Sequence, residues 1–313
     1  MHKLIVTTSK GLDELLKVEV ESILRTLNSN LEANNAEDEY DVPKIQLQPG
    51  QVSFIGSLKD AYQLCLHSRL ANRVLLVVAE GKVNSAEELY DVAKEAEWPS
   101  HFDSYVPFMI QFNGTNNAIN NSQFGALKVK DAIVDQFQEA GHERPSVDKL
   151  KPGIVIQARL RRDNLNICID LSGGSLHKRG YRTEAGDAPL KEHVAVGILM
   201  RIGWTQDTGS VLLDPMCGSG TIAIEAAMLA AHIPPNLEKE SWGFEHWSQH
   251  DNHIFSAVVE QAKSLISTPK APIYAYDLST KLVELAEQQH GLAKSRVDAT
   301  WSKAITATAR VGV

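Results

Sequence analysis

The sequence is poor in cysteine and in long apolar runs, and each of these absences excludes a class of protein. Its three cysteines, Cys65, Cys168 and Cys217, stand far apart, without a Cys-x-x-Cys pair or a histidine at metal-ligand spacing. Reduced thiols are therefore expected, with no metal. No run approaches the roughly 18–20 apolar residues of a membrane helix, and the first apolar run is too short for a signal peptide. These absences predict a cytoplasmic protein that does not bind a membrane.

Positive charge is also in deficit, with 31 Lys and Arg against 39 Asp and Glu, a formal net charge of −8. This balance argues against a protein that coats nucleic acid non-specifically, although a local basic surface could still hold a structured target. The composition, 43% hydrophobic and 22% charged, is typical of a globular protein, and 313 residues suit about two domains.

The apolar periodicity divides the chain into two regions. Up to about residue 171, short strands and helices follow one another and end in a hairpin at 162–164, which predicts an α+β region. Residues 172–189 are rich in glycine and form the best boundary. Beyond them strands alternate with helices, which predicts an α/β region with a parallel sheet and crossover connections.

The segment SVLLDPMCGSGTIAIEAAMLAA carries the strongest chemical signal. An apolar strand runs to Asp214, two glycines shape a turn, and an alanine-rich helix begins at Thr221. Glycine lets the backbone approach a ligand closely, and the free N–H groups of a helix start attract an anion or a carboxylate. A turn that uses glycine for geometry alone is the alternative. The loop has neither the third glycine of a nicotinamide-binding fingerprint, since Ala223 stands there, nor the lysine of a phosphate-binding loop.

The next predicted strand ends at Asp277, 63 residues after Asp214. A carboxylate at that strand tip could accept both hydroxyl groups of a ribose. The long gap implies an insertion over 232–253, in which Trp242, Phe244 and Trp247 are expected to pack the insertion onto the domain rather than to stack on a base.

Several motifs in one order resemble the bacterial THUMP-domain methyltransferases of large-subunit ribosomal RNA. They are GTNNAINNSQFGALKVKDAIVDQF, LHKRGYR, APLKE, DPMCGSGT followed by IEAA, and WGFEHW. The likeness is strongest to the guanine-N2-methyltransferase half of bifunctional 23S rRNA enzymes that also form 7-methylguanine, and it covers about residues 1–290. It implies a ferredoxin-like segment over 1–50, a THUMP RNA-binding domain over 51–171, a linker over 172–189 and a partial Rossmann-type (class I) methyltransferase domain over 190–313.

The resemblance implies S-adenosylmethionine as cofactor and 23S rRNA as partner, with transfer of a methyl group to guanine N2. It places the methionine part of the cofactor in the glycine loop, the ribose on Asp277, and Glu192 at the closing side of the site. The loop residues concerned are Asp214, Pro215, Met216, Cys217, Gly218, Ser219, Gly220 and Thr221.

Basic residues gather in one stretch of the acidic chain. Residues 151–182 hold seven basic residues against two acidic ones, and phosphate contacts of this kind position a protein on RNA without reading its sequence. Solvation of exposed faces is the alternative. The candidate RNA-binding residues are Lys128, Lys130, Arg159, Arg161, Arg162, Lys178, Arg179 and Arg182.

The Asn-Pro-Pro-Tyr motif that family members carry after their fourth strand does not occur in this sequence, so no catalytic residue is named. The text after Gly291 departs from the family pattern, and a shifted or incomplete reading frame is the favoured expectation over a shortened chain or a natural fragment. A non-catalytic rRNA-binding or ribosome-assembly protein with a vestigial loop is the second hypothesis. A nicotinamide-dependent oxidoreductase fits the loop poorly, and a DNA amine methyltransferase would not explain the first half. The oligomeric state and the target nucleotide stay open.

Overall fold

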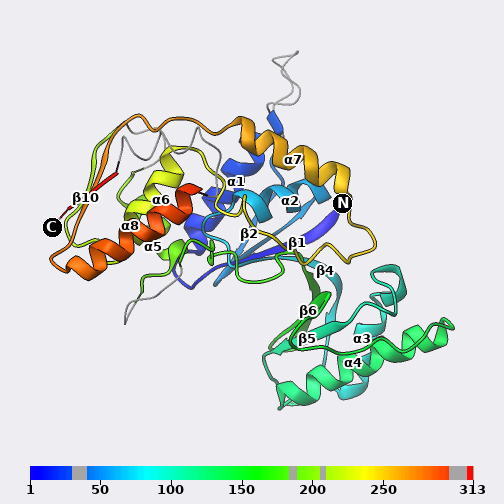
Figure 1. Ribbon diagram of the computed structural model, residues 1–313. Helices are drawn as coiled ribbons and strands as arrows, with labels where there is room; N and C mark the ends of the chain where they lie inside the picture. Colours follow the sequence, from blue (N-terminus) through cyan, green and yellow to red (C-terminus); the bar gives the residue numbers. More distant parts are fainter. Residues whose placement is uncertain (30–40, 183–188, 205–208, 296–308, 313) are drawn as a thin grey trace.

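The computed structural model describes residues 1–29, 41–182, 189–204, 209–295 and 309–312. These residues form a seven-stranded sheet from the first half of the chain and a three-stranded sheet from the second (Figure 1). The α+β region followed by a parallel α/β region that the sequence predicts is thereby confirmed.

The seven-stranded sheet has the order β2-β3-β1-β4-β7-β6-β5. β5 pairs with β6 in parallel, and the other neighbouring strands are antiparallel. Its strands are β1 (His2–Thr7), β2 (Gln46–Gln48), β3 (Gln51–Gly56), β4 (Arg73–Lys82), β5 (Phe108–Asn113), β6 (Ile154–Arg161) and β7 (Asn164–Asp170). The hairpin expected at 162–164 joins β6 to β7, and Arg162 takes the left-handed conformation in its turn with φ 56°.

The helices of this half share one hydrophobic core with one face of the sheet. They are α1 (Asp13–Ser29), α2 (Leu58–His67), α3 (Ala86–Lys94) and α4 (Ser122–Glu139), with a short 3-10 turn at Trp98–Ser100. Side chains alternate between the two faces of a strand. On β6 the alternate residues Ile156, Ala158 and Leu160 are buried in this core, together with Val129 and Ile133 of α4. Arg159 and Arg161 therefore belong to the face that α4 does not cover.

The first predicted domain limit falls inside this sheet. Residues 50 and 51 lie at the turn of the hairpin in which Gln48 of β2 pairs with Gln51 of β3, and β3 also pairs with β1 along its length. The predicted linker is described up to Arg182, and this part is built into the structure: Leu176 and Tyr181 are buried, and Ser172 accepts a hydrogen bond from the amide of Val74. Residues 183–188 lie outside the described ranges.

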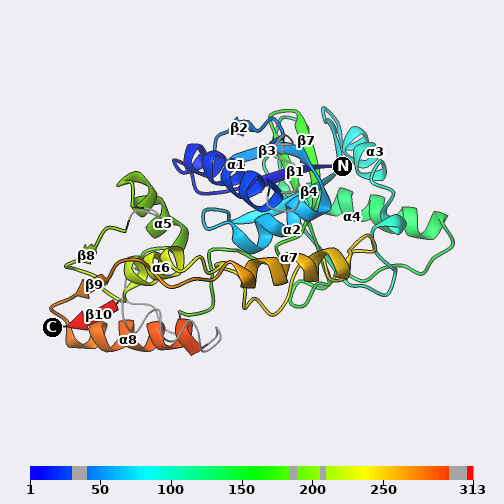
Figure 2. The same ribbon diagram turned by 90° about the horizontal axis from the view of Figure 1, so that it is seen from above.

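The second half holds β8 (Leu212–Asp214), β9 (Ile273–Tyr276) and β10 (Ala309–Gly312), three parallel strands with β9 in the middle. Helices α5 (Glu192–Arg201), α6 (Thr221–Ala230) and α8 (Thr280–Ser295) accompany them. Figure 2 shows this smaller lobe beside the larger one, with α7 (Asn252–Ser264) reaching from it along α2. The chain thus leaves the smaller lobe after α6, crosses the N-terminal lobe, and returns to form β9.

The returning segment packs into the N-terminal lobe through aromatic side chains. Trp242, Phe244 and Trp247 are buried, and the Phe244 ring lies 4.8 Å from the Tyr62 ring of α2 and 5.0 Å from that of Phe255. The prediction that these three residues pack rather than stack on a base agrees with their burial, but the predicted surface was wrong: they pack into the core of the N-terminal lobe and not onto the domain that contains the insertion.

A close backbone crossing fixes this segment beside β7. The amide of Gly243 donates to the carbonyl of Leu171 at 3.1 Å, and a Cβ atom at Gly243 would lie 1.9 Å from the carbonyl oxygen of Asp170. Glycine is required here because any side chain would force the two backbones apart.

We expect Phe244→Ala to lower the free energy of unfolding by about 3–5 kcal/mol, the range for truncating a fully buried aromatic residue. Urea unfolding of the intact chain measures this change. Leu150→Ala, at a position 92% exposed, is the control and should change stability by less than about 0.5 kcal/mol. Equal unfolding midpoints for the two variants would contradict the packing described.

Candidate functional site

The loop between β8 and α6 lies at the carboxyl ends of two parallel strands, the edge where ligands bind in open α/β sheets. Gly218 and Gly220 have φ of 55° and 81°, a region that favours glycine. Gly220 is the N-cap of α6. A Cβ atom built on Gly218 would meet nothing within 4 Å, so this part of the loop faces open space.

The carboxylates of Asp214 and Asp277 flank the loop, and the charge of Asp277 acts on Asp214. Asp277, one residue beyond β9, accepts hydrogen bonds from the amides of Gly218 and Ser279, both at 2.9 Å. These backbone donors lower the pKa of Asp277. Asp214 accepts from the amide of Met216 at 3.2 Å, and its pKa is raised by burial first and by the charge of Asp277 second. The structure therefore brings the two predicted carboxylates to one loop.

The remaining loop residues differ in exposure. Met216 is 83% exposed and Pro215 is exposed, whereas Ser219 is half-buried. Cys217 is buried and its amide donates to the carbonyl of Tyr276 at 2.8 Å, which ties the loop to the end of β9. Burial raises the pKa of the Cys217 thiol to about 11, so this cysteine is a neutral thiol near pH 7 rather than a nucleophile.

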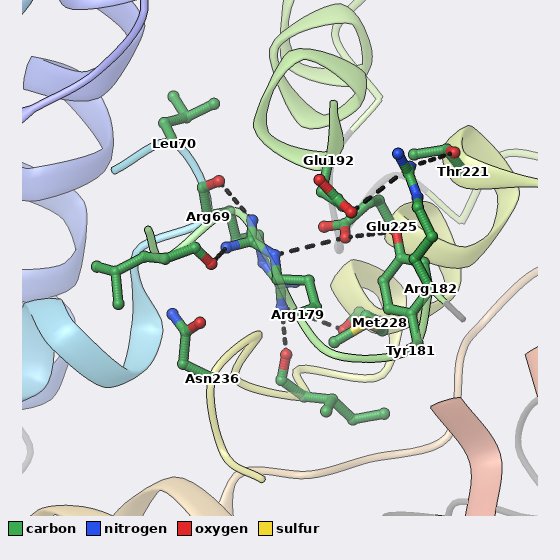
Figure 3. Close-up of polar contacts among 12 residues, drawn as sticks. Arg69, Leu70, Arg179, Tyr181, Arg182, Glu192, Thr221, Glu225, Met228 and Asn236 are labelled. Atoms are coloured by element: carbon green, nitrogen blue, oxygen red, sulfur yellow. Dashed lines mark hydrogen bonds and ion pairs between the residues drawn. The ribbon is translucent and has the colours of Figure 1, made fainter. Parts of the chain in front are cut away.

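Arg182 joins the start of α5 to the start of α6 (Figure 3). Its Nη2 donates to the carbonyl of Leu190 at 2.7 Å and to Oγ1 of Thr221 at 3.0 Å, and it forms an ion pair with Glu192 at 3.5 Å. Burial raises the pKa of Glu192. The structure thus corrects the assignment of Arg182 to the RNA-binding set, because its guanidinium is held at the glycine loop.

A buried charge cluster lies next to Arg182, around Glu225 of α6 (Figure 3). Glu225 has no exposed surface; it accepts a hydrogen bond from the Tyr181 hydroxyl at 3.1 Å and pairs with Arg179 at 3.5 Å. Arg179 also donates to the carbonyls of Leu176 and Arg69, at 2.6 and 2.5 Å. The structure corrects the second assignment as well: Arg179 is buried and its guanidinium is occupied by protein partners, so it is not presented to RNA.

Arg69, which sequence reasoning did not single out, links this cluster to the N-terminal lobe. Its Nη2 donates to the carbonyls of Met228 and Ile233, at 3.2 and 2.6 Å. Burial lowers its pKa to about 10, and the negative charge of Glu225 opposes this shift. Glu225 is the glutamate of the IEAA that follows DPMCGSGT, whereas Arg69 lies in none of the quoted motifs. No local signal could have marked their meeting, since it depends on how the two lobes pack.

The other predicted RNA-binding residues occupy separate places. Lys128 lies on α4 with its Nζ 5.9 Å from the centre of the Phe124 ring, and Lys130 pairs with Asp131 at 2.9 Å. Arg159 and Arg161 lie on the uncovered face of β6. The structure places Arg162 and Lys178 on the surface, both exposed.

Among the helices of the described residues, none has the length and the apolar character that a membrane span requires. No group of three or more His, Cys, Asp or Glu side chains is placed so as to hold a metal ion in the same ranges.

Comparison with known families identifies three domains in order along the chain. An RlmL ferredoxin-like domain matches residues 38–75, a THUMP domain matches residues 83–170, and an RMKL-like methyltransferase domain matches residues 179–310. The chain belongs to the family of methyltransferases that combine these three domains.

Its relatives are proteins named ribosomal RNA large subunit methyltransferase K/L. The chain is 46% identical to the protein of Pseudoalteromonas atlantica over 92% of its own length and 39% of that protein. It is 46% identical to the protein of Alteromonas mediterranea over 98% of its length and 43% of that protein. The chain therefore spans less than half the length of these relatives.

Solved structures agree on the fold. A possible methylase from Clostridium difficile is similar with a TM-score of 0.81 and 26% identity, covering the whole of this chain and 75% of that one. A putative methyltransferase complexed with SAH is similar in fold, with a TM-score of 0.76 and 24% identity, covering 99% of this chain and 74% of that one.

The family match also corrects one expectation. The likeness was expected to end near residue 291, but the match to the methyltransferase domain continues to residue 310, and residues 309–312 form β10 in parallel register with β9. The reason is that β10 has only four residues, which are too few to show an apolar periodicity in the sequence.

We expect Glu225→Ala to lower the free energy of unfolding by about 3–5 kcal/mol, because it leaves buried guanidinium groups without their counter-charge. Tyr181→Phe removes one hydrogen bond to the Glu225 carboxylate and should lower the free energy of unfolding by about 1–3 kcal/mol. Urea unfolding at pH 7 compares both with the control Glu240→Ala, at an exposed position. A Glu225 variant as stable as this control would refute the role of the cluster.

Protonation of His193 in acid is expected to lower the stability of the folded chain. The His193 Nε2 lies 2.7 Å from the Ser9 hydroxyl, and burial lowers the pKa of His193 from 6.5 to about 4. Between these values the unfolded chain binds a proton that the folded chain does not, so stability falls as the pH falls from 6.5 to 4. We expect His193→Gln to lose less stability over that range than the wild type does.

Urea midpoints measured from pH 7.5 to pH 4 test this expectation. His253→Gln, at an exposed position of α7, is the control and should follow the wild type. If the His193→Gln curve parallels the wild-type curve across the whole range, His193 is not the source of the acid sensitivity.

Proposed function

We propose that this chain binds S-adenosylmethionine in the loop 214–221 and methylates N2 of a guanine in 23S ribosomal RNA, which the N-terminal lobe holds. The observation that carries the proposal is the convergence of Asp214 and Asp277 on an open glycine loop at the carboxyl edge of parallel strands. The names of the relatives support the rRNA substrate, and the similar structure complexed with SAH supports the cofactor.

The residues present fit this cofactor. The open backbone at Gly218 leaves room for close approach of a ligand, and the α6 start offers N–H groups suited to the methionine carboxylate. Asp214 would accept from the methionine ammonium, and Asp277 from the ribose hydroxyls. Glu192, fixed by Arg182 at the first turn of α5, would close the site from the other side.

When bound, the cofactor supplies an electrophilic methyl group. The chain's own contribution is to hold that group in place: the bond of Asp277 to the Gly218 amide restrains the middle of the loop, and that of Arg182 to Thr221 restrains its end. Positioning of this kind lowers the entropic barrier to transfer. A guanine amine must leave its stack to reach such a site.

We further infer that the segment 172–189 joins an RNA-holding half to a methyltransferase half over 190–313, with a ferredoxin-like part over 1–50 and a THUMP part over 51–171. In this proposal Lys128, Lys130, Arg159, Arg161, Arg162 and Lys178 contact RNA phosphates. Because the substrate is ribosomal RNA, the protein would act in the cytoplasm.

We expect Asp277→Ala to weaken binding of S-adenosylmethionine by about 10-fold to 100-fold, because charge-assisted hydrogen bonds to the ribose hydroxyls are lost. Isothermal titration calorimetry of the intact chain measures this change. Asp163→Ala, at an exposed position in the β6–β7 turn, is the matched control and should bind as the wild type does.

Methyl transfer from labelled cofactor to 23S rRNA, mapped by primer extension, tests the reaction itself. A wild-type chain that binds neither S-adenosylmethionine nor S-adenosylhomocysteine would contradict the proposal and favour a non-catalytic rRNA-binding protein.

A further inference from the structure

A pocket of about 180 Å³ opens on the face of the seven-stranded sheet that α4 leaves uncovered. Strands from both parts of the N-terminal lobe contribute to it: β1, β2 and β3 from one side, and β5, β6 and β7 from the other. Its polar lining consists of Gln48, Gln51, Asn113, Arg159, Arg161 and Asn166. Among the residues that the structure describes around this pocket, two are arginines and none is acidic.

Arg159 is the most unusual of these residues. It lies opposite Asn166 in the antiparallel register of β6 and β7, so both side chains share the pocket face. Its Nη1 is buried and has no hydrogen-bond partner within the described ranges. Buried polar groups are nearly always paired in folded proteins. A guanidinium group has only N–H donors, so each of them can be satisfied only by an acceptor atom. The pocket is therefore lined by a positively charged side chain whose inner N–H donor protein atoms do not satisfy.

Arg161 stands two residues further along β6, on the same face. It donates to the side-chain carbonyl of Gln48 at 3.3 Å and to the backbone carbonyl of Pro49 at 3.1 Å. These bonds hold its guanidinium against the β2–β3 turn, and they leave further N–H groups of the guanidinium exposed to solvent. Two arginine side chains thus line one small pocket, Arg159 half-buried within it and Arg161 anchored at its rim.

The size and the charge of the pocket define what it can bind. Pockets that enclose whole drug-sized molecules start at roughly 300 Å³, so a pocket of about 180 Å³ takes one group of a larger molecule. Arginine forks match the oxygen atoms of a phosphate, and a lining that holds two arginines and no acidic residue favours an anion. The nearest acidic residue along the sheet, Glu80 opposite Asn166, is paired with Lys3. A phosphate group fits both conditions.

We propose that this pocket binds a backbone phosphate of the RNA substrate, at the point where the RNA passes from the ferredoxin-like part of the sheet to the THUMP part. The proposal rests on the proposed function for the identity of the RNA. The pocket is separated in the fold from the glycine loop, since the loop belongs to the three-stranded sheet. It acts by fixing the register of the RNA on the protein, and it takes no part in methyl transfer.

The test compares Arg159→Met and Arg161→Met with the wild-type chain in filter binding to transcribed 23S rRNA, over a series of salt concentrations. Each variant is expected to raise the Kd about 10-fold and to reduce the slope of log affinity against log salt by about one, the effect of one lost phosphate contact. Arg25→Met removes the same charge at an exposed position of α1 and is expected to change neither quantity.

Unchanged affinity and slope in both variants would overturn the proposal, as would a wild-type chain that does not bind this RNA. Arg161 is exposed, so its variant decides the matter if Arg159→Met fails to fold. Calorimetry with AMP and inorganic phosphate tests the other source of phosphate: binding that Arg159→Met abolishes, with rRNA affinity intact, would assign the pocket to a free nucleotide and contradict our proposal.

Cofactor binding separates this inference from the proposed function. Arg159→Met is expected to bind S-adenosylmethionine as the wild type does. A chain that binds no cofactor, but loses rRNA affinity in the two arginine variants, would support the pocket and contradict the methyltransferase activity.

Discussion

The carboxylate of Glu225 lies in α6 without exposed surface, and the guanidinium groups of Arg179 and Arg69 lie around it. A buried charge is tolerated in a protein interior when a counter-charge and hydrogen bonds satisfy it. Here Arg179 and Tyr181 supply the contacts, and Arg69 supplies charge from the N-terminal lobe. The bonds of Arg69 to the carbonyls of Met228 and Ile233, and that of Arg179 to the carbonyl of Arg69, therefore form only when the two lobes come together.

This requirement carries through to the candidate cofactor loop. Helix α6 bears Glu225 and also begins at Thr221, where Arg182 holds the end of the loop. Residues 179–182 thus bind the N-terminal lobe at one end and the loop at the other. The segment after α6 adds a second attachment, because Trp242, Phe244 and Trp247 are buried in the N-terminal lobe. The loop and the sheet face with Arg159 are parts of one packed structure.

Much of the local structure could be predicted because it depends on short-range patterns. The strand before Asp214, the glycines at 218 and 220 and the helix after them all follow from apolar period and backbone freedom. The meeting of Asp214 and Asp277 also follows, since parallel strands end at one edge of a sheet. The roles of Arg179 and Arg182 did not follow: in a basic stretch, charge alone does not distinguish a residue that faces solvent from one that a distant carboxylate draws inside.

The sequence by itself determined the order of the elements, the α+β and α/β character of the two halves and the glycine loop, because each depends on residues that are neighbours along the chain. Tertiary structure decided which arginines are buried, which lobe the aromatic insertion covers, and that Gln48 and Arg159 line one pocket. Those outcomes depend on residues brought together from more than a hundred positions apart. Burial and electrostatic pairing arise only when the whole chain packs, and no local pattern records them.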